Sequence, residues 1–216
     1  LLCLSSEIPT RILISVFQDR ANSLYKMRTL FGPSKRHHDD TSLRTFVGHS
    51  DCINSVVFSD DSKFLASASC DKTVKLWKAS SGECWRTFIG HRDCVSGVIF
   101  LPGSNELVSA SCDKTLKIWD MESSECVQTL QGHQDCVTFV MFLPGLNQLV
   151  SASCDRTIRI WDMKTAQCVR TLHGHQDCVT SVKFLDGSNE LVSASCDKTL
   201  KIWDMESSEC VQTWKG

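Results

Sequence analysis

The sequence lacks the features of proteins that bind nucleic acids or insert into membranes. Lys and Arg number 23 against 25 Asp and Glu, so a formal charge of -2 provides no bulk attraction for nucleic acid or anionic lipid. No apolar run approaches the roughly 20 residues that span a bilayer. The segment Leu1–Leu4 is too short for the apolar part of a signal peptide. We therefore expect a cytoplasmic protein, with the nucleus as an alternative, and neither a nucleic-acid nor a membrane partner.

Motifs of catalysis are also missing. The sequence has no phosphate-cradling glycine loop, no metal-ligand motif with matched clusters and no lone activated nucleophile. His37-His38 beside Asp39-Asp40 has no second cluster to complete a metal site, which favours a solvated linker. With 42% hydrophobic and 22% charged residues, the composition is that of a folded globular protein. We expect no enzymatic activity, no cofactor and no bound metal.

What the sequence does contain is an internal repeat of 42 residues. Gly-His pairs recur at a constant step, and a Trp follows each His after 28 residues. The pairs are Gly48-His49, Gly90-His91, Gly132-His133 and Gly174-His175, and the tryptophans are Trp77, Trp119, Trp161 and Trp203. The second and fourth repeats are identical at 35 of 42 positions, which suggests a recent duplication.

Each repeat is predicted to form four short strands. Apolar and β-branched residues cluster in segments that turn residues separate, and no apolar stripe keeps a helical period. In the first repeat the expected strands are Ile53–Phe58, Phe64–Ser69, Thr73–Lys78 and Cys84–Ile89. Four antiparallel strands in about 42 residues match one blade of a β-propeller, so the fold class is all-β.

The Gly-His and Trp-Asp pairs make the sequence similar to the WD-repeat family over about residues 41–216. The resemblance implies a tetrad in each blade, in which a His, a Ser, an Asp and a Trp share hydrogen bonds. The matching residues are His49, Ser67, Asp71 and Trp77; His91, Ser109, Asp113 and Trp119; His133, Ser151, Asp155 and Trp161; and His175, Ser193, Asp197 and Trp203. A Ser, a His and an Asp could also suggest a hydrolase triad, but four equal copies favour a structural role.

The resemblance also implies a ring of about seven blades, of which this chain holds four. We expect a fragment of a longer chain, the alternative being self-association of two half-rings through the uncovered end blades. Thr41–Val47 resembles the fourth strand of a blade and would be part of the ring closure. Residues 1–40 lie outside the repeats, with a helix predicted at Ile12–Leu30 and a linker at Gly32–Asp40.

In WD-repeat proteins, partners often contact three positions per blade, on the face formed by the turn between the second and third strands and by the stretch after the Gly-His pair. These map to Cys52, Asn54 and Cys70; Cys94, Ser96 and Cys112; Cys136, Thr138 and Cys154; and Cys178, Thr180 and Cys196. Two of the three are cysteines, and twelve of the 13 cysteines follow the repeat. Three interpretations stay open: small packing residues, reactive or disulfide-forming thiols with Cys52 near Cys70, and soft-metal ligands. We favour packing. Asp51 and Lys72, with their equivalents in the other repeats, add mixed charges to this face.

The leading functional hypothesis is a scaffold or adaptor that binds other proteins or peptides on this face. A second class is a sensor region in a larger signalling protein or enzyme. The repeats also look somewhat like those of lissencephaly-type dynein regulators, through phrases such as Val108-Ser109-Ala110-Ser111 and Asp113-Lys114-Thr115. The fold itself names no pathway.

Overall fold

The computed structural model describes residues 45–143, 145–185 and 187–216, and these form sixteen strands and no helix. The described residues belong to one compact unit, Arg44–Gly216. The strands form four separate antiparallel sheets, each with its strands in chain order or the reverse of it. The predicted all-β fold of four-stranded blades is confirmed. The helix and linker expected within residues 1–40 lie outside the described residues.

The strand bounds repeat from blade to blade, and those of the first blade agree with the sequence prediction. Blade 1 holds β1 (Ile53–Phe58), β2 (Phe64–Ser69), β3 (Thr73–Lys78) and β4 (Cys84–Ile89). Blade 2 holds β5 (Val95–Phe100), β6 (Glu106–Ser111), β7 (Thr115–Asp120) and β8 (Cys126–Gln131). Blade 3 holds β9 (Val137–Leu143), β10 (Gln148–Ser153), β11 (Thr157–Asp162) and β12 (Cys168–His173). Blade 4 holds β13 (Val179–Leu185), β14 (Glu190–Ser195), β15 (Thr199–Asp204) and β16 (Cys210–Lys215).

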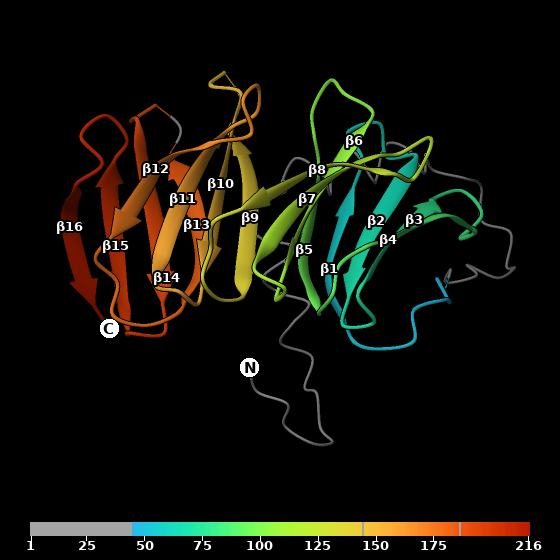
Figure 1. Cartoon of the computed structure of the whole chain (residues 1–216), viewed down its shortest axis with the longest axis horizontal. Helices are drawn as coiled ribbons and strands as arrows, with labels where there is room; N and C mark the ends of the chain where they lie inside the picture. Colours follow the sequence, from blue (N-terminus) through green and yellow to red (C-terminus); the bar gives the residue numbers. More distant parts are fainter. Residues whose placement is uncertain (1–44, 144, 186) are drawn as a thin grey trace, which may run out of the picture. The chain divides into compact units, whose positions relative to one another are not determined.

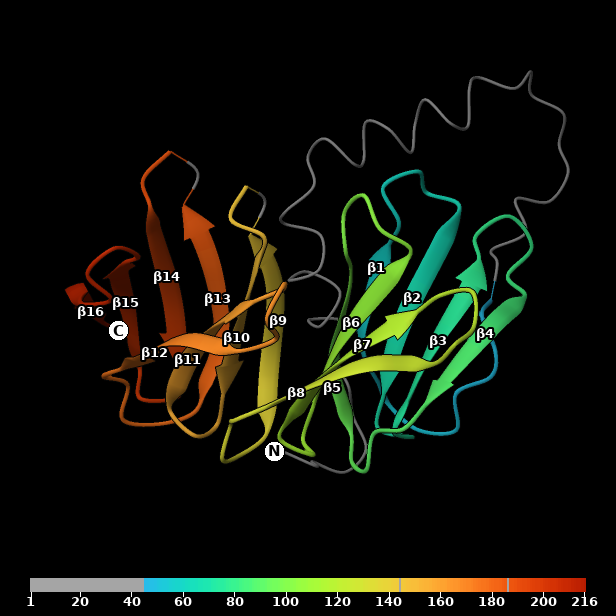
Figure 2. The same ribbon diagram turned by 45° about the horizontal axis from the view of Figure 1, so that its top comes forward.

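Within this unit the blades stand side by side in chain order (Figure 1). The first strands β1, β5, β9 and β13 follow one another from blade to blade, and β5, β9 and β13 each pack against the second strand of the blade before (Figure 2). The apolar core is therefore divided among the three seams between blades. In the seam of blades 2 and 3, Val108, Ala110 and Leu116 meet Val137 and Val140. The other two seams bury the equivalent residues.

The Gly of each Gly-His pair is required by close packing on a Trp. A Cβ at Gly90 would lie 3.1 Å from Cη2 of Trp119, and one at Gly132 would lie 3.1 Å from Cη2 of Trp161. Because each Trp is 1% exposed and held in the core, the ring has little room to move. The Gly-His signature in the sequence thus records the approach of the backbone to the indole.

Candidate functional site

The four tetrads form the same hydrogen-bond chain in every blade. In blade 3, the indole Nε1 of Trp161 donates to Ser151 Oγ over 2.8 Å, and that hydroxyl lies 2.7 Å from Nε2 of His133. Nδ1 of His133 lies 2.7 Å from Oδ2 of Asp155. Since a carboxylate only accepts, Nδ1 of the imidazole is the donor to Asp155, and Nε2 forms the hydrogen bond with the Ser151 hydroxyl. Blades 1, 2 and 4 repeat these contacts within 0.1 Å.

The tetrads are closed to substrate. The four His side chains are 0–2% exposed and the four Asp side chains 7–8%. Burial would raise the pKa of Asp155, but hydrogen bonds from His133, Thr157 and the backbone of Gln134 outweigh it and lower that pKa. The carboxylate of Asp155 therefore stays charged, and both of its oxygens accept hydrogen bonds. The Ser hydroxyl is held between two ring nitrogens, so the arrangement ties the second and third strands of a blade to the two loops that carry the His and the Asp, and it leaves no free nucleophile.

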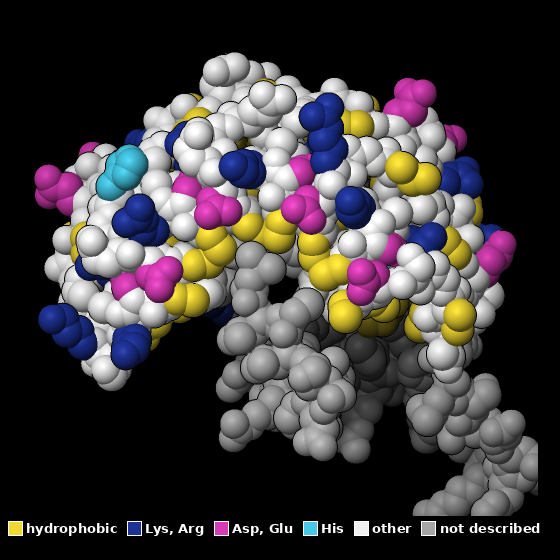
Figure 3. All heavy atoms as spheres, turned by 60° about the horizontal axis from the view of Figure 1, so that its bottom comes forward, with side chains coloured by type: hydrophobic (Ala, Val, Ile, Leu, Met, Phe, Trp, Pro, Cys, Tyr) yellow, Lys and Arg dark blue, Asp and Glu magenta, His cyan; other side chains and the backbone are white. Residues whose placement is uncertain are grey.

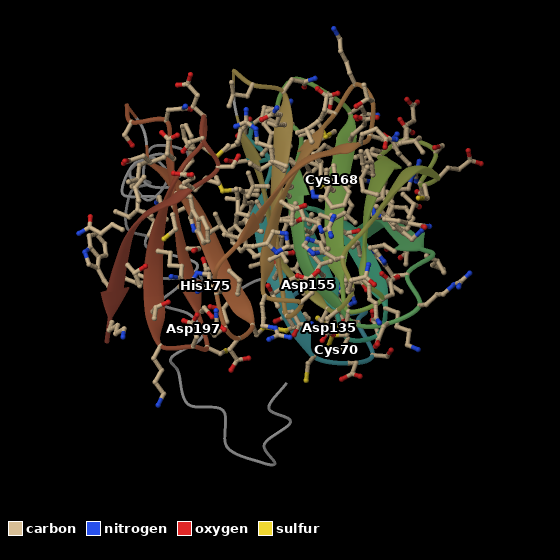
Figure 4. The ribbon with its side chains drawn as sticks, turned by 60° about the vertical axis from the view of Figure 1, so that its left-hand side comes forward. Cys70, Asp135, Asp155, Cys168, His175 and Asp197 are labelled. Carbon is tan, nitrogen blue, oxygen red and sulfur yellow. A yellow bond between two sulfur atoms is a disulfide. The ribbon has the colours of Figure 1, made fainter. Side chains whose placement is uncertain are left out.

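The predicted partner-binding positions lie at one end of all four blades, in the loop of the tetrad Asp and at the start of each first strand. Figure 4 shows Cys70, Asp135, Asp155, His175 and Asp197 toward this end, with Cys168 away from them. We call this end the loop face. It comprises the connections into each first strand and between each second and third strand. The residues expected to bind partners are brought together here, but most of them face a neighbouring blade.

Six of the eight loop-face cysteines form disulfides across the seams. The pairs are Cys70–Cys94, Cys112–Cys136 and Cys154–Cys178, each with a sequence separation of 24 and Cα atoms 3.7–3.9 Å apart. The alternative that Cys52 pairs with Cys70 is therefore wrong. The backbones of these two residues do meet, since Cys70 N donates to Cys52 O over 2.8 Å, but the Cys70 sulfur bonds to the next blade. The favoured packing interpretation is corrected in the same way for these six cysteines.

A β-bulge in the first strand of blades 1, 2 and 3 directs a polar side chain to the seam with the next blade. Asn54, Ser96 and Thr138 are each left out of the ladder by a register shift. A bulge re-aims the side chain of the extra residue. Asn54 Nδ2 donates to Val95 O of the next blade over 2.9 Å, and lies 3.2 and 3.1 Å from the sulfurs of Cys70 and Cys94.

The other two seams have the equivalent bond, from Ser96 Oγ to Val137 O and from Thr138 Oγ1 to Val179 O. Nine of the twelve predicted contact positions thus join blades to one another. The remaining three are Cys52, Thr180 and Cys196, all exposed, at the two ends of the series. Thr180 donates instead to Ala194 O within its own blade.

The side chains that the loop face presents to solvent are charged and amide groups. An acidic series lies two residues after each His, and a basic series follows each tetrad Asp; all eight residues are exposed. They are Asp51, Asp93, Asp135 and Asp177, and Lys72, Lys114, Arg156 and Lys198. Figure 3 looks toward this end of the blades, where acidic and basic side chains lie beside one another.

One variable position on this face was not predicted from the sequence. The residue after each His is exposed and changes from Ser50 to Arg92 to Gln134 and Gln176. Its backbone N–H donates to the tetrad Asp over 2.9–3.0 Å, which fixes the backbone and leaves the side chain free to vary. Variation inside an otherwise constant motif was the signal that could have found it.

Metal clusters and membrane-spanning helices are absent from the described part of the chain. Residues 45–143, 145–185 and 187–216 contain no group of three or more His, Cys, Asp or Glu side chains placed to hold a metal. The His37-His38 pair lies outside them. No helix among these residues is long and apolar enough to cross a membrane.

Comparison with known proteins agrees with the geometry. The profile described as "WD domain, G-beta repeat" matches residues 40–78, 82–120, 124–162 and 166–204. The chain belongs to the WD-repeat family. It is also similar to the "WD repeat-containing protein 89 homolog" of Dictyostelium discoideum, with 41% identity over 46 residues, which is 21% of this chain and 13% of that protein. The match therefore covers only a small part of the length of this relative.

The WD repeats and the blades are offset by one strand. The match at residues 82–120 begins just before β4 of blade 1 and ends with β7 of blade 2. By the same offset, the match at 40–78 begins before β1. Within it, Phe46 lies edge-on to Trp77 with ring centroids 5.8 Å apart, as Phe88 of β4 lies 5.8 Å from Trp119.

Phe46 therefore occupies the place of a fourth-strand residue, although Thr45–Val47 is not in a strand. The rest of the predicted strand Thr41–Val47 lies outside the described residues. The contact between Phe46 and Trp77 follows from this offset. Each WD repeat begins with the segment that packs on its own Trp, as Phe88 packs on Trp119.

Proposed function

We propose that this WD-repeat chain is a non-catalytic scaffold that binds a protein or peptide on the loop face. The observation that carries the proposal is the division of polar groups between two roles. The Ser, His and Asp of every tetrad satisfy one another and are buried, whereas eight exposed charges of both signs recur around the loops. WD repeats are generally protein-interaction modules, and patterned charge favours steering and orientation of a macromolecular partner over chemistry.

The binding residues in this proposal differ from those expected from the family pattern. The twelve pattern positions serve mainly to hold the blades, so the charged series and the variable residue after each His supply the contacts. Lys114 and Arg156 are exposed side chains of adjacent blades, and both have left-handed backbones, with φ of 73° and 70°. The tight turn there projects them away from the sheets. We expect a partner segment with acidic groups spaced to meet successive blades.

The proposal is tested by charge reversal with a matched control. Proteins that cross-link to the wild-type chain in cells are compared with those that cross-link to Lys114→Glu/Arg156→Glu. The control is Lys63→Glu/Lys164→Glu, which makes the same change in net charge at the opposite end of the blades. A partner lost from the loop-face variant, retained by the control and cross-linked to loop-face residues supports the proposal.

Two results would contradict it. Partners could be lost equally from both variants, which would mean that net charge and not the loop face matters. Alternatively, a fluorophosphonate probe could label a tetrad Ser such as Ser109, which would show a reactive hydroxyl where the structure places a satisfied one.

A cytoplasmic location forms part of this proposal, and the disulfides make it testable. Structural disulfides persist in oxidising compartments, while the cytosol keeps most thiols reduced. In a cytoplasmic protein the six paired cysteines would therefore be thiols in the resting cell. Alkylation of intact cells before lysis, followed by peptide mapping, measures that state. Full protection of all six from alkylation would count against the cytoplasmic assignment.

A further inference from the structure

The central seam, between blades 2 and 3, holds a cysteine pair whose two members differ in exposure. Cys112 lies in the loop between β6 and β7 and is partly exposed, whereas Cys136 lies just before β9 and is 8% exposed. Their sulfurs form a disulfide across the seam. Because the reactivity of a thiol follows its access to solvent, a dissolved reagent reaches the Cys112 sulfur more readily than the Cys136 sulfur.

The charges beside the two cysteines differ in the same sense. Lys114, two residues after Cys112, is exposed and has a left-handed backbone in its turn. Asp135, directly before Cys136, is also exposed, and its carboxylate accepts the N–H of Cys136 over 2.7 Å, which holds the negative charge beside that residue. Asp113, the neighbour of Cys112, is bound in the tetrad with its side chain 7% exposed. An anionic reagent is therefore attracted toward Cys112 and repelled from Cys136.

The seam also has contacts that contain no sulfur. Val137, which follows Cys136, is 0% exposed and belongs to the same apolar cluster as Val108 of blade 2. The hydroxyl of Ser96 donates to the carbonyl of Val137 across the seam. These contacts hold the two blades together when the cysteines are thiols, so the backbones of Cys112 and Cys136, with Cα atoms 3.7 Å apart, stay side by side.

We propose that the seams are reversible redox sites for a small anionic disulfide such as oxidised glutathione, and that in the central seam Cys112 takes up the reagent and Cys136 resolves the adduct. The other two seams repeat the order of charges, with a basic residue two positions after the first cysteine and an aspartate that accepts the N–H of the second. These residues are Lys72 and Asp93, and Arg156 and Asp177. The inference concerns the cysteines and holds whether or not the loop face binds a partner, so it fails separately from the proposed function.

Both steps are thiol–disulfide exchanges. The Cys112 thiolate attacks one sulfur of oxidised glutathione, forms a mixed disulfide and releases one glutathione. The Cys136 thiolate then attacks the Cys112 sulfur, closes the seam disulfide and releases the second glutathione. One S–S bond breaks in the reagent and one forms in the protein, and the reagent takes up the two electrons and two protons that the cysteines lose. Because the folded seam holds both cysteines in place, the second step is intramolecular. An excess of reduced glutathione reverses both steps.

Oxidation connects the blades in a continuous row at the loop face. Within blade 2, Cys112 N donates to Cys94 O over 2.8 Å. Within blade 3, Cys154 N donates to Cys136 O over 2.9 Å. The seam disulfides, such as Cys70–Cys94, continue these hydrogen bonds from one blade to the next. The redox state of the seams therefore sets how firmly the loops of adjacent blades are held to one another.

The experiment treats the reduced full chain with oxidised glutathione, quenches samples with acid at intervals and maps the cysteines by mass spectrometry. In the wild type, glutathione is expected on Cys112 first and the Cys112–Cys136 disulfide afterwards, an order that tests the assignment without any substitution. Cys136→Ser should keep the adduct on Cys112. In Cys112→Ser the adduct on Cys136 should form at least about tenfold more slowly. Cys126, an exposed free cysteine of β8, should react at one rate in every variant and is the internal control.

The role of charge is tested by Lys114→Gln, which should slow the adduct on Cys112, whereas Lys63→Gln, at the opposite end of the blades, should not. Equal rates on Cys136 and Cys112, a wild-type adduct that is never resolved, or seam cysteines that stay unmodified while Cys126 reacts would each overturn the proposal. Loss of the β-sheet circular dichroism on reduction would overturn it too, because the site exists only in the folded seam.

Discussion

Replacement of Ser151 by Ala should destabilise the protein by an amount that the tetrad geometry sets. Ser151 is fully buried, and its hydroxyl accepts from the Trp161 indole at 2.8 Å and lies 2.7 Å from His133 Nε2. Alanine leaves both nitrogens buried without their partner. An unsatisfied buried polar group costs about 1–3 kcal/mol, so the two together predict a loss of about 2–6 kcal/mol.

Urea denaturation followed by circular dichroism measures this loss, with the disulfides kept oxidised. For a slope of about 2–3 kcal/mol/M, the midpoint should fall by about 1–3 M. Ser181→Ala, at an exposed position of β13, serves as the control and should change stability by less than about 0.5 kcal/mol. A double-mutant cycle with Trp161→Phe should show that the losses are less than additive, because both changes break one bond. Equal midpoints for Ser151→Ala and Ser181→Ala would refute the assigned role.

Three further predictions concern the seams, the pH range and the close approach at the Gly-His pair. Reduction of the disulfides should lower the free energy of unfolding by about 3 kcal/mol per broken disulfide, because each one restricts a loop of the unfolded chain. Urea midpoints with and without a phosphine reductant measure this loss, and Cys112→Ser/Cys136→Ser should show a smaller drop on reduction than the wild type. The tetrad Asp residues have folded-state pKa values below the ordinary 3.8, so their contribution to stability is present above about pH 4 and is lost as the pH falls below it. Melting temperatures measured from pH 6 to pH 2 should fall accordingly, and they should fall less steeply in Asp155→Asn. Gly132→Ala should cost about 1–3 kcal/mol by pressing a methyl on Trp161, whereas Gly103→Ala, which has open space, should lose only what its backbone angle demands.

The sequence by itself determined the blades. A strict spacing of 42 residues, with turn residues between short β-rich segments, was enough to predict strands such as Phe64–Ser69 with the bounds that the structure has. The reason is local: side chains that alternate between solvent and core, and turns that need particular backbone angles, leave their pattern within one repeat. The tetrad residues carry the same kind of record, because each one sits at a constant distance from the Gly-His pair.

Only the tertiary structure decided what lies between blades. Cys52 is closer in sequence to Cys70 than Cys94 is, and it lies opposite Cys70 across one hairpin. The Cys70 sulfur nevertheless bonds to Cys94 of the next blade. A bulge at Asn54, which the residue pattern does not mark, directs that side chain into the seam. Both outcomes depend on how one rigid sheet packs on another, a relation between segments that no single repeat encodes. For the same reason, positions expected to contact a partner became contacts between blades.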